Sequence, residues 1–168
     1  MPVDSFKFLP RLIETFYRSV EIDPPGEIPW TPLAKPLREC TFGLVTSGGL
    51  HPRGAEPFDL EREQAEPTWG DPTYRAIPVD LPQEQLRVSH LHYNPRSVEL
   101  DRNVLLPVDR FRELAAAGEI GGLAPQAYSF MGYQGFPPDT TAWRETYGPQ
   151  VAGFLKDQGV DCVLLTPS

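Results

Sequence analysis

Apolar residues along this chain follow two spacings, and each predicts a different kind of element. Short apolar runs bounded by turn residues occur at 40–46 (CTFGLVT) and 160–165 (VDCVLL), a pattern typical of buried parallel strands. Shorter runs at 74–79, 86–89 and 126–131 predict three further strands.

Helical spacing of apolar residues marks three other segments. It predicts helices over 4–20, where the part after Pro10 is the more secure, over 107–117, and over 139–158 with a break at Gly148-Pro149. Two further stretches lack periodicity: the proline-rich 22–36 predicts an extended lead-in, and the polar 51–73 predicts a long surface excursion.

Strands that alternate with helices of about ten residues imply parallel crossover connections. We therefore predict an α/β fold: an open, mainly parallel sheet with helices on both faces, like half of a Rossmann-like or flavodoxin-like fold. We expect an N-terminal helix and lead-in over 1–36 and an α/β domain over 37–168. The last strand lacks a covering helix, so we interpret the domain as incomplete; the alternative is an edge strand at a natural terminus.

Composition narrows the class of protein and of partner. The 168 residues include 15 basic and 23 acidic side chains, a net charge of -8, which disfavours a nucleic acid or an anionic membrane as partner. No apolar run approaches the ~20 residues of a membrane helix, and the first residues do not form a secretory signal. Two scattered cysteines, Cys40 and Cys162, fit a reducing cytoplasm and lie inside predicted strands, where they act as small apolar residues. Proline is the unusual component, with 20 residues that interrupt regular structure along the chain.

Polar residues gather where the predicted strands end. Ligands of open α/β sheets bind at the carboxyl ends of strands, and all three histidines of the chain lie near two of these ends. The histidines His51, His90 and His92 are therefore candidates for a site in the crevice at these strand ends. For substrate binding, the turn of Thr46, Ser47, Gly48 and Gly49 would offer backbone N–H groups to a carboxylate.

The histidines leave several interpretations open at this point. They can exchange protons with a substrate near neutral pH, three of them can hold a zinc ion, or they can be structural residues with satisfied hydrogen bonds. No glycine fingerprint for a dinucleotide or a phosphate loop is present.

Six strings, in order from about residue 28 to the end, together resemble the selenoprotein B family of the glycine, sarcosine, betaine and D-proline reductases. The strings are Trp30-Thr31-Pro32-Leu33-Ala34-Lys35-Pro36-Leu37, Leu44-Val45-Thr46-Ser47-Gly48-Gly49-Leu50-His51, Asp71-Pro72-Thr73-Tyr74-Arg75, Ser89-His90-Leu91-His92-Tyr93, Pro107-Val108-Asp109-Arg110 and Tyr128-Ser129-Phe130-Met131-Gly132.

The resemblance implies a component of an oxidoreductase that reductively cleaves a carbon–nitrogen bond of a small amino acid or its N-methylated derivative. It implies a selenocysteine, or a cysteine in some members, as nucleophile, a thiol reductant, and a partner subunit with a pyruvoyl group. In the family the redox residue follows the strand and turn matched here by Leu164-Leu165-Thr166-Pro167-Ser168. We therefore expect the redox residue directly beyond Ser168, encoded by a selenocysteine codon that was read as a stop. We expect no cofactor and no redox nucleophile within these 168 residues.

On this interpretation His51, His90, His92 and Tyr93 line the crevice beside that nucleophile, with Ser129 as a further candidate. Two alternatives stand beside it. One is a metal-dependent hydrolase that uses His51, His90 and His92. The other is a non-catalytic module that binds a small carboxylate or a partner subunit.

Overall fold

The computed structural model describes residues 8–19, 26 and 30–168. The chain divides into two compact units, 1–32 and 33–168. In the first unit, helix α1 (Arg11–Ser19) confirms the predicted helix after Pro10, while positions 4–7 and 20 of that prediction lie outside the described residues. Much of the predicted lead-in, 22–25 and 27–29, also lies outside them.

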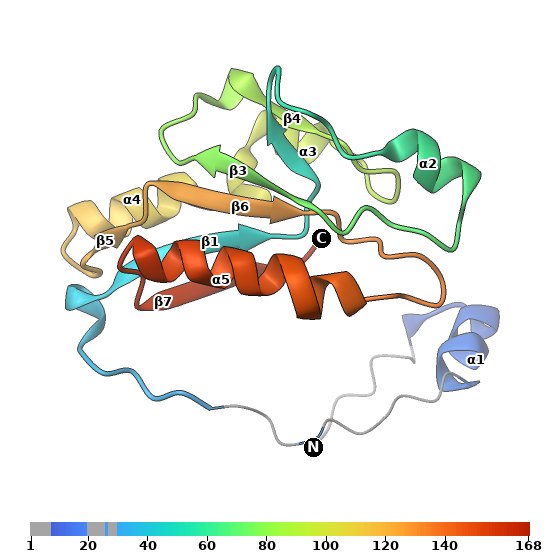
Figure 1. Cartoon of the computed structure of the whole chain (residues 1–168), viewed down its shortest axis with the longest axis horizontal. Helices are drawn as coiled ribbons and strands as arrows, with labels where there is room; N and C mark the ends of the chain where they lie inside the picture. The colour runs from blue at the N-terminus through green and yellow to red at the C-terminus, as the bar shows by residue number, and fades with distance from the viewer. Residues whose placement is uncertain (1–7, 20–25, 27–29) are drawn as a thin grey trace. The chain divides into compact units, whose positions relative to one another are not determined.

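The second unit is built on a mixed sheet whose centre is β1 (Thr41–Thr46). Strand β7 (Cys162–Thr166) pairs in parallel with residues 42–46 of β1. Strand β5 (Gly122–Leu123) pairs in parallel with the start of β1, and β6 (Gln126–Phe130) with its end. The β1 residues that pair with β5 and β6 also pair with β7, so β7 lies along one edge of β1 and β5 and β6 lie along the other (Figure 1). Beyond β6 lies the antiparallel β3 (Tyr74–Pro78). The predicted α/β class with a mainly parallel sheet is confirmed.

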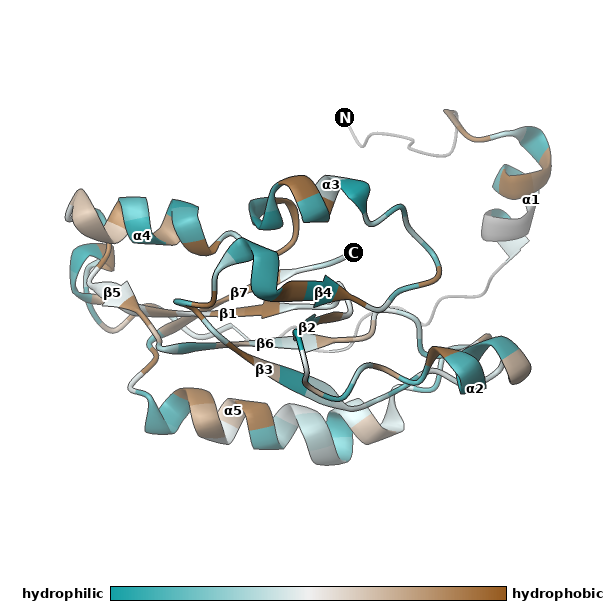
Figure 2. Ribbon diagram, turned by 90° about the horizontal axis from the view of Figure 1, so that it is seen from above, coloured by the Kyte–Doolittle hydropathy of each residue, from teal (hydrophilic) through white to brown (hydrophobic). Residues whose placement is uncertain are grey.

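Helices cover both faces of this sheet. Figure 2 shows α3 (Arg96–Leu100) and α4 (Val108–Ala116) on one face and α5 (Gly148–Asp157) on the other. The predicted break at Gly148-Pro149 falls where a π-helical stretch, Trp143–Tyr147, runs into α5. Short 3₁₀ turns complete the elements: Leu37–Glu39, Gln83–Gln85 and Arg102–Val104. No helix in the described parts of the chain is long and apolar enough to cross a bilayer.

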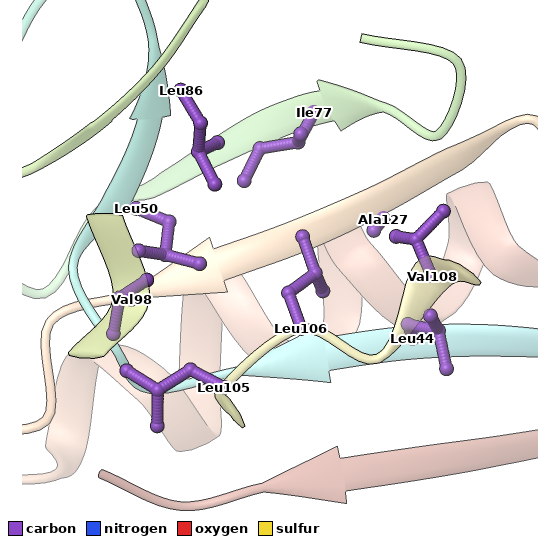
Figure 3. Close-up of a cluster of buried hydrophobic side chains, with 9 residues drawn as sticks. All are labelled: Leu44, Leu50, Ile77, Leu86, Val98, Leu105, Leu106, Val108 and Ala127. Carbon is purple, nitrogen blue, oxygen red and sulfur yellow. The ribbon is translucent and has the colours of Figure 1, made fainter. Parts of the chain in front are cut away.

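Two apolar clusters form the core, one on each face of the sheet. The larger joins the sheet to α3, α4 and two short strands, β2 (Leu50–Pro52) and β4 (Leu86–Val88). Figure 3 shows its members, Leu44, Leu50, Ile77, Leu86, Val98, Leu105, Leu106, Val108 and Ala127. The smaller lies beneath α5 and consists of Tyr128, Phe130, Val151 and Leu155. Burial on both faces explains why β1 and β6 appear in the sequence as nearly continuous apolar runs.

The predicted strand at 86–89 forms, but it does not join the main sheet as expected. β4 (Leu86–Val88) pairs antiparallel with β2 (Leu50–Pro52) in a separate two-stranded sheet. The turn that separates them from β1 depends on Gly49, whose φ is +63° and where a Cβ would lie 2.3 Å from the Ser89 carbonyl oxygen. The turn therefore needs glycine, and the N–H of Ser89 donates to the Gly49 carbonyl at 2.8 Å.

The expected surface excursion over 51–73 is in fact partly ordered and buried. It contains α2 (Leu60–Ala65), whose first turn is capped by the carboxylate of Asp59 accepting from the N–H of Arg62 at 2.9 Å. Arg75 of β3 donates to the carbonyls of residues 56 and 57, and Phe58 is 2% exposed beneath its guanidinium. These contacts hold α2 beyond the carboxyl ends of β1 and β6 (Figure 1).

Candidate functional site

Three parallel strands end at one place, and their last residues are bonded together. Beyond β1 and β7, the N–H of Ser168 donates to Ser47 Oγ at 3.0 Å, and Ser168 Oγ donates to the Ser47 carbonyl at 2.9 Å. The loop after β6 approaches at Gly132, where a Cβ would lie 2.8 Å from Ser168 Oγ. The absence of a side chain at Gly132 thus permits the three strand ends to meet, at the edge where α/β sheets bind ligands.

His90 directs its Nε2 atom towards this junction. Its Nδ1 accepts the backbone N–H of His92 at 3.1 Å, and its Nε2 lies 3.5 Å from Ser168 Oγ. Burial, helped by the nearby His92, lowers the pKa of His90 to about 4, so the ring is neutral at pH 7. Because Nδ1 is an acceptor, Nε2 carries the proton and donates towards Ser168.

Tyr93 packs against the ring of His90. The two rings lie 4.4 Å apart between centroids, and the Tyr93 hydroxyl donates to the Gly48 carbonyl at 2.6 Å. Burial raises the pKa of Tyr93 to about 12. Tyr93 is therefore a neutral phenol that ties the histidine segment to the turn after β1.

His92 has a different set of neighbours. Its Nε2 lies 2.9 Å from Oε1 of Glu63, a residue of α2 that is only 3% exposed. Its ring packs on Tyr133 with 4.2 Å between ring centroids. Burial raises the pKa of Glu63, and the hydrogen bond from His92 opposes that shift. Glu63 and Tyr133 are absent from the candidates drawn from the sequence, since nothing in the polar stretch around Glu63 marks one acid as buried.

His51 is the middle residue of β2, paired with Arg87 of β4, and both of its ring nitrogens are engaged. Nδ1 donates to the Pro52 carbonyl at 3.1 Å, so Nε2 accepts from the hydroxyl of Ser89 at 2.9 Å. Burial lowers the pKa of His51, which keeps the ring neutral. The sequence groups His51 with the other histidines, but this geometry leaves it no free nitrogen for a substrate.

Ser129 is fully buried on β6, and its hydroxyl oxygen accepts the N–H of Leu50 at 2.7 Å. It joins the main sheet to β2 and does not face the strand-end junction with a free hydroxyl. The contact explains a buried serine in an apolar strand, because an unpaired Leu50 N–H would be costly there.

The turn predicted to bind a carboxylate uses its N–H groups within the fold. The N–H of Ser47 donates to the Thr166 carbonyl at 3.1 Å, that of Gly48 to Thr46 Oγ1 at 3.1 Å, and that of Gly49 to the Phe130 carbonyl at 2.8 Å. The Ser47 and Gly49 donors therefore join β1 to β7 and β6, and the Gly48 donor is engaged within the turn itself. Thr46 to Gly49 lie at the junction, where the N–H groups of Ser47, Gly48 and Gly49 are engaged within the fold; their part in binding a substrate carboxylate stays a prediction.

Metal and thiol chemistry have little support in this arrangement. Within the described ranges, no group of three or more His, Cys, Asp or Glu side chains is placed to hold a metal ion. Cys40 is fully buried with Sγ near the carbonyls of Lys35 and Pro36, and burial raises the pKa of Cys162. Neither thiol is set up as a thiolate nucleophile.

Comparison with known proteins gives a consistent result. The family model described as glycine/sarcosine/betaine reductase selenoprotein B matches residues 10–168. The chain is 40% identical over 147 residues to a D-proline reductase subunit gamma of Acetoanaerobium sticklandii, covering 88% of the chain and 55% of the relative. It is 32% identical over 153 residues to a glycine reductase complex component B subunit gamma of Carboxydothermus hydrogenoformans, covering 91% of the chain and 34% of the relative.

A betaine reductase complex component B subunit beta of Peptoclostridium acidaminophilum is 27% identical over 133 residues, covering 79% of the chain and 29% of the relative. The chain thus spans between about a third and about half of the length of these relatives. No solved structure matches it.

Proposed function

Because the chain belongs to the glycine/sarcosine/betaine reductase selenoprotein B family, we propose that it forms part of a reductase that cleaves a carbon–nitrogen bond in an amino acid or its N-methylated derivative. The relatives named above are subunits of D-proline, glycine and betaine reductases. We propose that this chain likewise acts with partner subunits and a thiol reductant.

The observation that carries the proposed site is the position of His90. Its Nε2 faces Ser168 at 3.5 Å, at the carboxyl end of β7. By the family pattern, this is where a selenocysteine or cysteine would follow. That group would supply the nucleophile for C–N cleavage when present. A neutral Nε2–H at this point suits it, since a hydrogen-bond donor stabilises a selenolate or thiolate as charge develops.

This chain's own residues would then prepare the site. Tyr93 and the turn after β1 hold His90, while Gly132 keeps the junction free of a further side chain. The pyruvoyl group that the family resemblance implies belongs, in this proposal, to a partner subunit. We place the reductase in the reducing cytoplasm, because Cys40 and Cys162 are neighbouring thiols that remain free.

The position of the redox residue is tested at the level of the gene. An in-frame TGA after the Ser168 codon, followed by coding sequence, supports a selenocysteine there. A TAA or TAG with no continuation contradicts it.

The activity is tested with the reassembled reductase and a dithiol. D-proline is assayed first, because identity to the D-proline reductase subunit, at 40%, exceeds that to the glycine reductase subunit, at 32%; glycine, sarcosine and betaine follow. We expect substrate-dependent dithiol oxidation. His90→Phe should lower kcat by about 10²-fold or more, as for loss of one charge-stabilising donor, while His90→Gln, which keeps an N–H donor, loses less.

The 168-residue chain alone is the negative control, since its two thiols are unsuited to attack. Turnover by this chain alone would contradict the proposed mechanism. Absence of C–N cleavage with all four substrates would contradict the proposed activity.

A further inference from the structure

Glu63 is a buried acid whose presence the fold alone does not explain. Its side chain is about 1% exposed, and Oε1 pairs with Nε2 of His92 at 2.9 Å. Its other oxygen, Oε2, is buried without a hydrogen-bond partner among the described residues. A carboxylate buried with a single partner costs the folded state more than an apolar side chain of similar size.

The charged and titratable groups around Glu63 act in opposite directions. Burial and the nearby Asp71 raise the pKa of Glu63, and His92 lowers it. Asp71 accepts from the N–H groups of Asp59 and Thr73, at 3.1 Å and 2.9 Å, and faces Arg75 at 3.7 Å. His92 is thus the one group described around this acid that stabilises its charge.

The ring of His92 connects this acid to the open side of the site. Its side chain is 48% exposed, and one face packs on Tyr133. In the part of the chain that the structure describes, no hydrogen bond to His92 Nδ1 is found. A carboxylate that accepts at Nε2 fixes the tautomer and leaves Nδ1 as the proton acceptor.

We propose that Glu63 is a positioning residue of the site, which holds the His92 ring through Nε2–H and so leaves Nδ1 to take up and release a proton on the open side. This inference deepens the proposed function and relies on it for the identity of the reaction. Cleavage of a C–N bond requires a proton for the departing amine. We assign it to His92 Nδ1, which first takes up a proton from solvent, then transfers it to the amine and returns to the neutral ring held by Glu63.

The inference gives two neighbouring histidines different tasks. His90, held at Nδ1 by the backbone, offers an N–H at Nε2 towards Ser168. His92, held at Nε2 by Glu63, offers a lone pair at Nδ1. The strand-end junction would thereby have a fixed donor on one side and a proton carrier on the other.

The coupling is tested on the 168-residue chain by NMR titration of the Glu63 carboxyl carbon, with exposed Glu61 of the same helix as internal reference. His92→Phe keeps an aromatic ring for Tyr133 but removes the contacts that lower the Glu63 pKa. We expect Glu63 to titrate at higher pH in this variant and Glu61 to be unchanged. An unchanged Glu63 titration would overturn the inference.

Stability separates a functional acid from a structural one. Glu63→Met should unfold at a urea concentration equal to or above that of the wild type, because the apolar side chain removes a buried charge. Glu61→Met is the matched control for the same substitution at an exposed position. A clear fall in the midpoint for Glu63→Met, but not for Glu61→Met, would assign Glu63 to the fold and overturn the inference.

In the active reductase, Glu63→Met should lower kcat at least tenfold with KM within twofold, and Glu63→Asp should recover part of the loss. Glu61→Met should be as active as the wild type. If the wild type cleaves no C–N bond, the proposed function fails, whereas the titration of Glu63 still decides whether the acid and His92 are coupled. Wild-type kcat in Glu63→Met would overturn the inference.

Discussion

At the scale of single residues, each polar side chain near the strand ends is defined by the partners of its individual atoms. His51 is buried, His90 is half-buried and both rings are neutral at pH 7, yet only His90 keeps a ring nitrogen directed at the junction. Ser129 and Tyr93 hold backbone groups of neighbouring segments. The hydrogen-bond partners therefore separate residues that serve chemistry from residues that serve the fold, even though the sequence groups them together.

Ser129→Ala tests the structural role of that serine. It removes the acceptor of the buried Leu50 N–H, and an unsatisfied buried donor costs about 1–3 kcal/mol of unfolding free energy. Urea denaturation measures the loss. Ser97→Ala, on the exposed surface of α3, is the matched control and should change stability little. Equal stability of both variants would show that the Ser129 hydroxyl is dispensable for folding.

His90 makes stability depend on pH in a predictable direction. Its pKa is about 4 in the fold against 6.5 without the fold's influence, so the unfolded chain binds the proton more readily. The contribution of His90 is fully present above pH 6.5 and is lost as the pH falls from 6.5 towards 4. We expect the urea midpoint of the wild type to fall between pH 7 and pH 5, and that of His90→Gln to fall less. The lowered pKa of His51 makes stability fall with pH in the same direction in both proteins. If the urea midpoints of the wild type and His90→Gln fall by equal amounts between pH 7 and pH 5, the prediction for His90 is contradicted.

At the scale of elements, buried polar contacts hold short segments that have little stability of their own. α2 has six residues and α3 five, too few for a stable isolated helix. The connection from α3 to α4 is held by Arg102, which is 7% exposed and donates to both oxygens of Asp109, at 3.0 Å and 2.7 Å. These contacts explain why loops with many prolines still hold defined positions.

Asp109→Asn tests this clamp between the 3₁₀ turn at Arg102–Val104 and α4. The variant leaves a buried guanidinium without its carboxylate, and we expect a loss of about 2 kcal/mol. The hydrogen bonds from Arg102 lower the pKa of Asp109 to about 2. The pair's contribution is therefore present above pH 3.8 and is lost as the pH falls through 2.

Urea denaturation at several pH values should accordingly show a wild-type advantage over Asp109→Asn that shrinks below about pH 4. Glu119→Gln, in the exposed turn after α4, is the control. A difference that stays constant with pH would show that charge on Asp109 is not its source.

Periodicity predicted the elements better than their partners. The runs at 40–46, 126–131 and 160–165 became β1, β6 and β7, because residues buried on both faces leave a strong apolar signal. The run at 86–89 also formed a strand, β4, but the prediction that it joins the main sheet was wrong. The turn at Gly49 directs β2 into a second sheet with β4, and no local sequence pattern shows which strands pair. Glu63 was missed because the residue that pairs with it, His92, lies 29 positions away in the sequence.

At the scale of the whole molecule, the unit formed by residues 33–168 presents an apolar strand at one edge of its sheet. Within that unit β7 pairs only with β1, and its Val163 and Leu165 are 45% and 70% exposed. They line an apolar groove of about 880 Å³ together with Val151 and Leu155 of α5. An exposed strand edge beside such a groove favours self-association.

Leu165→Lys should therefore reduce self-association of the 168-residue chain. Sedimentation velocity over a range of concentrations measures the effect, with Leu100→Lys as control, since Leu100 is 86% exposed on α3. We expect the wild type and Leu100→Lys to associate with rising concentration and Leu165→Lys to remain smaller. Equal association of all three proteins would show that the β7 edge is not responsible.

The pairing of β1 with β7 also sets an order for biosynthesis. Thr46 Oγ1 donates to the Thr166 carbonyl across 120 positions of the chain, so the central strand is synthesised well before this neighbour. While the ribosome adds the residues between them, one edge of β1 has no native partner, and non-local pairing of this kind is slow and prone to misfolding. This edge of β1 therefore stays without its native partner in the nascent chain until the residues of β7 have left the ribosome.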